Sequence, residues 1–427
     1  MSEAAVKSVI TCDLEGRIET FSKSASEIFG YSAEEVIGKK RVSLFSPGLT
    51  VLEHVPHWLS SASKNGAFET KTVFVRKDGS RFPASVRITP TFRDGKQIGY
   101  CGVTRPLPNQ ELNAATPKIS LATRIFAGFV ITRAPFLTAT IVPVVLGALL
   151  ARSHQFGWKW GYFIPALIGA CALQVAANTF NDYFDWKSGA DPENNEYFLP
   201  FSGGSRSIEL GLISERGLWN LSVAALGIAA IIGAYLSWIH GFAIIGYGLL
   251  GAFAAYFYTA PPLRLVARRG LGELFVGLCF GPMLCAGSYT AMSGIVRWEA
   301  FAVGVPAGLL TTAILWINEF PDSASDAKVG KNHLVVTLGK KPARWGYLVL
   351  LAGAFLILAA LVASQLLPTQ ALAAVLSAPV AVVAIRRVFV HYDRRELIQG
   401  NRLTILLQLL FGCLMAAGMH FGTRSAF

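Results

Sequence analysis

The spacing of hydrophobic positions divides the chain into two parts of different character. Up to residue 117 apolar and polar residues are mixed, and several short runs alternate as half-buried strands do. Beyond Phe126 the sequence consists of apolar runs of about 20 residues separated by charged loops, and runs of that length can cross a bilayer as helices. We therefore expect a multi-domain protein, with an N-terminal α+β domain followed by an all-α polytopic membrane bundle.

The membrane part is predicted to contain about nine transmembrane helices. The apolar runs lie at residues 126–150, 161–181, 218–238, 241–258, 271–292, 299–319, 344–365, 369–386 and 403–421. Lysine and arginine concentrate in the alternate loops that share a side with the N-terminus, and the positive-inside rule places that side in the cytoplasm. The predicted division is 1–105 for the small domain, 106–123 for a polar linker and 124–427 for the membrane domain, in the cell inner (cytoplasmic) membrane.

Composition supports this division and excludes one partner class. The chain has 427 residues, of which 53% are hydrophobic and 15% charged, and its mean hydropathy is +0.47. The net charge of +12 is explained by the short loops between spans, so no nucleic-acid partner is predicted. The six cysteines are scattered in mostly apolar context without metal-type spacing, which indicates small core residues and no disulfide framework.

The N-terminal part carries the pattern of a small α+β domain. Two short strands flank a turn at Asp13–Gly16, helices are expected at 24–28 and 32–37, and alternating strands follow at 68–76, 81–90 and 97–104. The strings Asp13-Leu-Glu-Gly-Arg-Ile, Arg76-Lys-Asp-Gly-Ser-Arg-Phe-Pro-Ala and Asp94-Gly-Lys-Gln-Ile-Gly-Tyr are similar to those of PAS domains. Residues 9–105 therefore resemble a PAS domain, and the resemblance implies a sensory module that also allows a homodimer through this domain.

The sequence identifies no ligand for the PAS-like domain. The flavin photoreceptor branch is similar only in outline, because no cysteine lies between Gly38 and Ser46, where its reactive thiol would be expected. His54 and His57 lie on a predicted helix, and surface or packing roles are favoured over haem ligation for both. The PAS ligand is therefore left unknown.

The candidate chemistry begins at the end of the second span. The apolar run Tyr162–Ala177, interrupted only by Gln174, leads into a segment in which Asn178, Asp182 and Asp185 share one helical face. Ionisable groups at membrane depth are costly and usually functional. Clustered carboxylates and amides are the hard oxygen ligands that suit Mg²⁺ bound to substrate phosphates. On its own the segment is equally compatible with a solvated helix end.

A second segment repeats the pattern. Asn318, Asp322 and Asp326 follow the apolar run at 301–317 with the same spacing. Two such faces at helix ends favour two metal sites that hold one diphosphate between them. The transporter alternative is weaker, because transporters place such groups near the bilayer midplane.

Other polar residues are expected around the same end of the bundle. A Gly203-Gly-Ser-Arg206 turn offers backbone N–H groups and a guanidinium to phosphate, although a plain loop is an equal alternative. Glu273 opens the fifth span and has either a helix-start or a substrate role. Lys331 lies beside the second Asp-rich segment, where its charge would neutralise diphosphate.

The chain contains the strings Thr132-Arg-Ala-Pro-Phe-Leu-Thr, Tyr258-Thr-Ala-Pro-Pro-Leu and Gly270-Leu-Gly-Glu-Leu-Phe in addition to the two Asp-rich segments. Through these motifs, residues 124–422 resemble the UbiA superfamily of intramembrane prenyltransferases. The resemblance is closest to the 1,4-dihydroxy-2-naphthoate polyprenyltransferases of menaquinone synthesis. One departure is that Asn332-His333 stands where relatives often carry Arg-Thr, which puts that loop's phosphate contacts in doubt.

The resemblance implies a Mg²⁺-dependent transfer of a polyprenyl group from its diphosphate to an aromatic acceptor. The implied metal and catalytic residues are Asp182, Asp185, Asp322 and Asp326, with Lys331 as a further catalytic residue. The implied substrate-binding residues are Asn178, Asn181, Lys187, Asp191, Arg206, Tyr258, Arg264, Asn318 and Arg133. The PAS-like domain would modulate this activity.

Two alternatives stay open. The acceptor is 1,4-dihydroxy-2-naphthoate or, with the same fold, 4-hydroxybenzoate, a chlorophyll-type precursor or a glycerophospholipid precursor. A non-catalytic, membrane-anchored PAS sensor is a different class of protein. All six ligand-type residues of the Asp-rich segments remain, and no output module is visible, which favours the enzyme.

Overall fold

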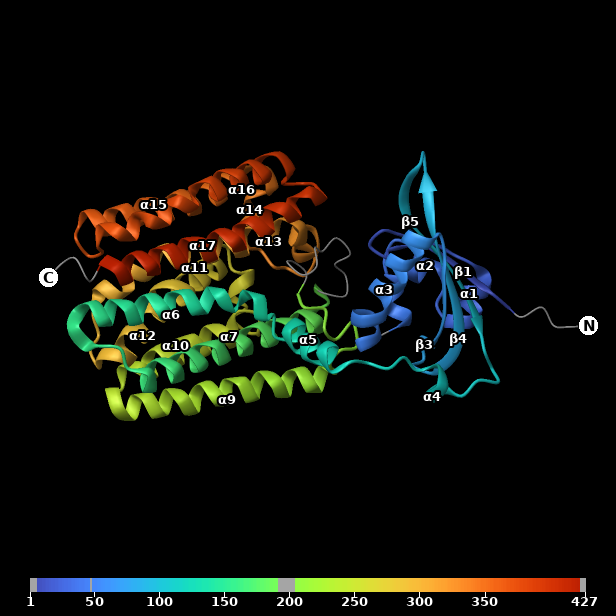
Figure 1. Ribbon diagram of the computed structural model, residues 1–427, viewed down its shortest axis with the longest axis horizontal. Coiled ribbons are helices and arrows are strands. Elements are labelled where there is room, and N and C mark those ends of the chain that lie inside the picture. The colour runs from blue at the N-terminus through green and yellow to red at the C-terminus, as the bar shows by residue number, and fades with distance from the viewer. Residues whose placement is uncertain (1–5, 47, 191–203, 423–427) are drawn as a thin grey trace, which may run out of the picture. The chain divides into compact units, whose positions relative to one another are not determined.

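The computed structural model describes residues 6–46, 48–190 and 204–422, which form two compact units (Figure 1). The first unit comprises Met1–Ile131 together with Arg206–Ser214, and the second comprises Thr132–Ser205 with Glu215–Phe427. A short segment from the loop between two membrane helices therefore belongs, by its contacts, with the N-terminal unit.

The first unit is built on one five-stranded antiparallel sheet. Its strands are β1 (Ser8–Asp13), β2 (Ile18–Phe21), β3 (Phe68–Val75), β4 (Arg81–Arg93) and β5 (Lys96–Pro106), in the order β2-β1-β5-β4-β3. Its helices are α1 (Lys23–Phe29), α2 (Ala33–Val36), η1 (Val42–Phe45), α3 (Leu49–Asn65), α4 (Leu112–Ala115) and α5 (Leu121–Ile131). The strands and short helices that the sequence predicted are confirmed, including a capping box in which Glu35 accepts from the backbone N–H of Ser32 at 2.9 Å.

Aromatic side chains fill the space between this sheet and its helices. Phe29 lies at the centre, with ring centroids 4.2 Å from Phe45, 5.7 Å from Phe74 and 5.6 Å from Phe82. Cys12 is buried beside this core, and burial raises the pKa of its thiol to about 12. At neutral pH Cys12 is therefore protonated and behaves as a small apolar residue.

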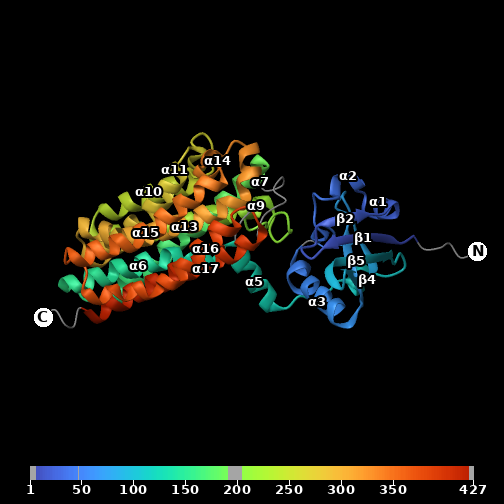
Figure 2. The same cartoon turned by 90° about the horizontal axis from the view of Figure 1, so that it is seen from above.

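The second unit is a bundle of long helices that run roughly parallel (Figure 2). Its elements are η2 (Ala134–Leu137), α6 (Thr138–Ala151), η3 (Arg152–Phe156), α7 (Trp160–Ser188), α9 (Glu215–His240), α10 (Ala243–Phe257), η4 (Leu265–Ala267), α11 (Leu271–Leu278), η5 (Cys279–Met283), α12 (Leu284–Ser293), α13 (Trp298–Lys328), α14 (Leu334–Leu338), α15 (Lys340–Ala363), η6 (Thr369–Ser377), α16 (Ala378–His391), η7 (Arg395–Leu397) and α17 (Ile398–Gly422).

Within the described residues, eight helical stretches are long and apolar enough to span a membrane, so this is a multi-pass membrane protein. They lie at Ala134–Phe156, Trp160–Ser188, Glu215–His240, Leu271–Ser293, Trp298–Lys328, Lys340–Ala363, Thr369–His391 and Arg395–Gly422. The ninth predicted span, 241–258, is helix α10, which has 15 residues and is shorter than the others.

Helix α13 occupies the centre of the bundle, where it contacts α6, α11, α12, α15 and α17. Glycines let its backbone approach a neighbour closely. A Cβ atom built on Gly304 would lie 2.5 Å from the carbonyl oxygen of Gly281 in η5, and one built on Gly308 would lie 2.3 Å from that of Gly277 in α11. Small residues at such crossings are how membrane helices maximise packing contacts.

We expect Gly304→Ala to destabilise the bundle, because its methyl group would press against backbone that cannot rotate away. Overpacking of this kind costs about 1–3 kcal/mol, and thermal unfolding of the purified protein would measure it. Gly246→Ala in α10 is the matched control, since a Cβ there meets no atom within 4 Å. Equal unfolding midpoints for the two variants would contradict the packing argument.

Candidate functional site

The polar end of α7 carries the first set of predicted site residues. Asp182 and Asp185 are both buried. Asp182 forms an ion pair with Arg133 and accepts a hydrogen bond from the backbone N–H of Ser205 at 3.2 Å. Asn178 donates to the carbonyl oxygen of Thr132 at 3.1 Å. The carboxylate of Asp182 is therefore held between an arginine that precedes the first span and the loop that follows α7.

The polar end of α13 meets that of α7 through one lysine. The ammonium group of Lys331 lies 2.7 Å from a carboxylate oxygen of Asp185 and 3.5 Å from one of Asp326. Lys331 is buried, and its own backbone N–H donates to the carbonyl oxygen of Asp326 at 2.9 Å. Asp322 is half-buried one turn earlier. The structure thus brings both Asp-rich segments to one place, as the sequence predicted.

A buried histidine and two glutamates complete this cluster, and sequence reasoning had not paired them. His333 is 1% exposed, with Nε2 at 3.3 Å from Asp326 and Nδ1 at 3.4 Å from Glu319. Glu273 accepts from the backbone N–H of Leu334 at 2.7 Å. Glu273, in the first turn of α11, therefore also anchors the start of α14. Of the two residues that depart from the family pattern, His333 is buried and Asn332 is exposed.

Asn318 has a partner that the sequence did not reveal. Its side-chain oxygen accepts from Nδ2 of Asn401 at 2.6 Å, and Asn401, on α17, is 1% exposed. The two residues are 83 positions apart, so no local motif joins them. The only sign of this contact in the sequence is that Asn401 is a polar residue just before the apolar run at 403–421.

Three further predicted residues have other partners in the second unit. Asn181 donates to the hydroxyl of Thr259 at 2.6 Å, and Arg264 donates to the carbonyl oxygen of Val329 at 3.2 Å. The first contact ties helix α7 to the loop after α10, and the second joins two loops. Lys187 pairs with Glu215 on the exposed surface. Its predicted substrate role has no support from these contacts.

Of two further predicted residues, one belongs to the first unit and the other lies outside the described residues. Arg206 belongs to the first unit, where its guanidinium lies 2.9 Å from Glu209. Asp191 lies outside the described residues. Both stay predictions.

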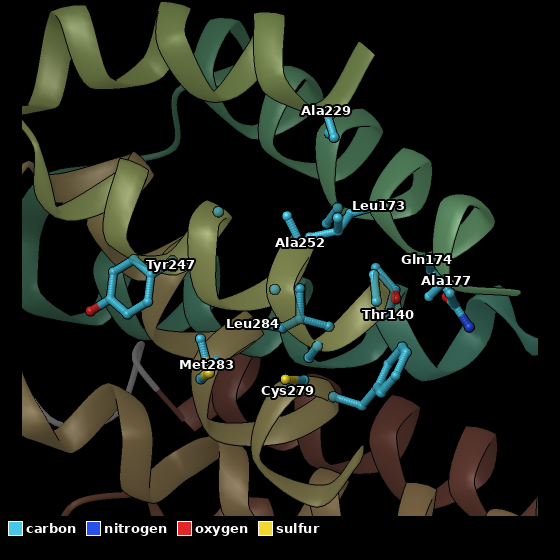
Figure 3. A pocket seen from close by; sticks show the side chains of 18 of the residues that line it. Thr140, Leu173, Gln174, Ala177, Ala229, Tyr247, Ala252, Cys279, Met283 and Leu284 are labelled. Carbon is cyan, nitrogen blue, oxygen red and sulfur yellow. The ribbon is translucent and has the colours of Figure 1, made fainter. Parts of the chain in front are cut away.

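A cavity of about 570 Å³ opens from this polar end into the bundle (Figure 3). At the polar end it is lined by Arg133, Asn178, Asn181, Tyr258 and Asn318. Farther in, the walls come from α6, α7, α9, α10, α11, η5, α12 and α13 and consist mostly of alanine, glycine and aliphatic side chains. One end can therefore hold an anion beside cations and amides, while the rest suits an apolar chain.

The donor set fits a divalent cation that prefers oxygen. Asp182, Asp185, Asp322 and Asp326 supply hard carboxylate oxygens, as Mg²⁺ requires. Among the described residues no three His, Cys, Asp or Glu side chains are grouped closely enough to hold a metal ion. In this arrangement Arg133 and Lys331 supply the positive charge instead. The metal assignment stays a prediction.

Comparison with known proteins agrees with this geometry. The model of the UbiA prenyltransferase family matches residues 140–419, and a PAS domain model matches residues 6–104. The chain is 28% identical over 293 residues to the 1,4-dihydroxy-2-naphthoate octaprenyltransferase of Bacillus subtilis, covering 68% of this chain and 90% of that protein.

Two further comparisons extend the similarity. The chain is 29% identical to the 2-carboxy-1,4-naphthoquinone phytyltransferase of Synechocystis, covering 66% of this chain and 90% of that protein. A solved UbiA homologue from Aeropyrum pernix superposes with a TM-score of 0.52 at 19% identity, over 66% of this chain and 98% of that one. The last comparison supports the fold of the helical unit alone.

We expect Asn401→Leu to weaken diphosphate binding, because the oxygen of Asn318 would lose its buried donor. An unsatisfied buried acceptor costs about 1–3 kcal/mol, which would correspond to roughly 5- to 150-fold if the whole cost fell on binding. Calorimetric titration with inorganic diphosphate in the presence of Mg²⁺ would measure the change. Asn220→Leu, at an exposed position of α9, is the control. Unchanged affinity in the Asn401 variant would refute the positioning role.

Proposed function

Because the chain belongs to the UbiA prenyltransferase family, we propose that it transfers a polyprenyl group from polyprenyl diphosphate to an aromatic acceptor, 1,4-dihydroxy-2-naphthoate. The observation that carries the proposal is the meeting of two aspartate-bearing helix ends around Lys331, at the end of a cavity whose far walls are apolar. Relatives named for naphthoate and naphthoquinone acceptors support the choice of ring, and menaquinone synthesis is the corresponding pathway.

The residues of the polar end would act on the leaving group. Asp182, Asp185, Asp322 and Asp326 would hold Mg²⁺, which when bound supplies positive charge to the diphosphate. Arg133 and Lys331 add fixed positive charge beside the same carboxylates. Developing negative charge on the departing diphosphate is therefore met by groups that are already in place, which lowers the barrier to ionisation.

The apolar walls would serve the rest of the reaction. The bond between the allylic carbon and the diphosphate oxygen breaks, and the electron pair leaves with diphosphate. The ring then forms a carbon–carbon bond to the allylic carbon, and the substituted ring carbon loses its proton or, where it carries a carboxyl group, carbon dioxide. A cavity lined by alanine, glycine and aliphatic side chains limits the water that would otherwise capture the cation.

We place the catalytic end and the PAS domain on the cytoplasmic side of the inner membrane. The support is the concentration of lysine and arginine in the loops at that end, among them Lys187, Arg264 and Lys331.

We expect Asp182→Asn and Asp322→Asn each to lower prenyl transfer by about 100-fold or more, since each removes charge stabilisation worth several kcal/mol. Membranes incubated with labelled polyprenyl diphosphate and a panel of aromatic acceptors would give the rates and identify the acceptor. Asp393→Asn, at an exposed loop position, is the matched control. Near wild-type turnover of both variants at limiting Mg²⁺ would contradict the metal assignment. Transfer to 4-hydroxybenzoate alone would show that this ring, and not 1,4-dihydroxy-2-naphthoate, is the acceptor.

The PAS domain is proposed to modulate transfer. In the first unit the backbone N–H of Gly48 donates to the carbonyl oxygen of Leu210 at 2.5 Å. Leu210 belongs to the segment Arg206–Ser214, which continues directly from Ser205, and Ser205 donates to Asp182. A ligand that changes the PAS domain would therefore act on a segment bonded covalently to the site.

Deleting residues 1–105 is expected to leave transfer measurable while changing its rate by a few-fold, because Leu210 would lose its partner at Gly48. The comparison is made on correctly inserted protein, with initial rates at saturating and limiting acceptor. If the truncated protein had no activity under any condition, the PAS domain would belong to the catalytic unit. Identical rates under every condition would refute modulation.

A further inference from the structure

Two polar side chains lie in a part of the cavity wall that is otherwise apolar. Gln174 on α7 is 5% exposed and Thr140 on α6 is 0% exposed, and both line the cavity. The side-chain oxygens Oε1 of Gln174 and Oγ1 of Thr140 are buried and have no hydrogen-bond partner among the described residues. Figure 3 shows both side chains among those that line the cavity. Buried polar atoms are nearly always hydrogen-bonded, so this pair calls for a ligand.

The orientation of the Gln174 amide follows from its one partner. Its Nε2 donates to the carbonyl oxygen of Phe136 at 2.8 Å. A carbonyl oxygen can only accept, so the amide nitrogen must face Phe136 and the amide oxygen must point elsewhere. Gln174 therefore presents an acceptor to the cavity region.

Thr140 differs from most other buried threonines among the described residues of the bundle. Thr290, Thr312 and Thr404 each donate their hydroxyl to the carbonyl oxygen four residues earlier, at 2.7–3.0 Å. For Thr140 that carbonyl belongs to Phe136, which already accepts from Gln174. The carbonyl of Phe136 also accepts from the backbone N–H of Thr138, so both of its lone pairs are used and the hydroxyl of Thr140 lacks the usual bond.

The chemistry of the pair selects between the two substrates. A glutamine oxygen requires a donor, whereas a prenyl chain has none and an ionised diphosphate only accepts. A ring hydroxyl both donates and accepts, so it can satisfy Gln174 and Thr140 together. We propose that Gln174 and Thr140 bind a hydroxyl group of the aromatic acceptor and make the protein selective for hydroxylated rings. This inference rests on the proposed function.

The selectivity arises because an acceptor without the hydroxyl would leave the oxygens of Gln174 and Thr140 without a partner. Such a ring would bury the two oxygens with no partner, and sites built to hydrogen-bond a hydroxyl reject analogues that lack it. The apolar walls around the pair, such as Ala177 and Leu173, cannot compensate.

The test compares the acceptor with its two mono-deoxy analogues, 1-hydroxy-2-naphthoate and 4-hydroxy-2-naphthoate, as competing ligands of the full-length protein. For wild type we expect one analogue to bind at least tenfold more weakly than 1,4-dihydroxy-2-naphthoate. The ratio of the dissociation constant of that analogue to that of 1,4-dihydroxy-2-naphthoate should fall to about one in Thr140→Val and in Gln174→Met. The KM for polyprenyl diphosphate should stay within twofold of wild type. Thr140→Ser, which keeps the hydroxyl, should retain the wild-type ratio.

Thr312→Val is the matched control, because Thr312 is buried and back-bonded and is not part of the cavity wall. Its ratio should equal that of wild type. If the ratio is unchanged in both the Thr140 and the Gln174 variants while wild type transfers the prenyl group normally, this inference alone is overturned. Gln174 and Thr140 would then have a structural or water-binding role. Wild type that transfers to no aromatic acceptor overturns the proposed function, and the inference with it.

Discussion

Burying several carboxylates at the end of membrane helices is the constraint on which this structure depends. Asp182, Asp185, Asp326, Glu319 and Glu273 come from three helices and lie in a region with little exposure to solvent. Removing an ion from water costs several kcal/mol, and neighbouring like charges add to that cost. The fold meets this cost with cations of its own, since Arg133 pairs with Asp182 and Lys331 lies between Asp185 and Asp326.

Lys331 can reach both aspartates because of the backbone that precedes it. Helix α13 ends at Lys328, and Gly330 then adopts a φ of +74°, a conformation that glycine tolerates best. The chain turns back so that the N–H of Lys331 caps the carbonyl of Asp326. One turn thus caps a helix and places the ammonium group against the other helix. His333 follows with contacts to Asp326 and Glu319, so α14 begins against the same carboxylates.

Small residues have two different effects in the bundle. Small residues such as Gly248 and Ala252 on α10 leave space along the cavity, whereas the glycines of η5 and α13 bring backbones into contact. Polar groups enter the apolar wall at Gln174 and Thr140, where a buried oxygen without a partner is a source of selectivity.

The sequence by itself determined the local features of this protein. Runs long enough to cross a bilayer, the strand alternation of the PAS domain and the placement of Asn178, Asp182 and Asp185 on one face all depend on periodicity, and periodicity is local. The repeat of that face at Asn318 even indicated that two helices share a site. Residue types at helical spacing were sufficient for these conclusions.

Tertiary structure alone decided which side chains meet across the bundle. Asn401 reaches Asn318 over 83 positions, and Gln174 reaches Phe136 over 38, so neither contact has a sequence signature. Gln174 was visible only as the interruption of an apolar run. Lys187 was predicted to bind substrate and Lys331 to take part in catalysis, yet Lys187 pairs on the surface with Glu215 whereas Lys331 is buried. Which lysine is buried depends on how helices pack, and packing joins residues that lie far apart in the chain.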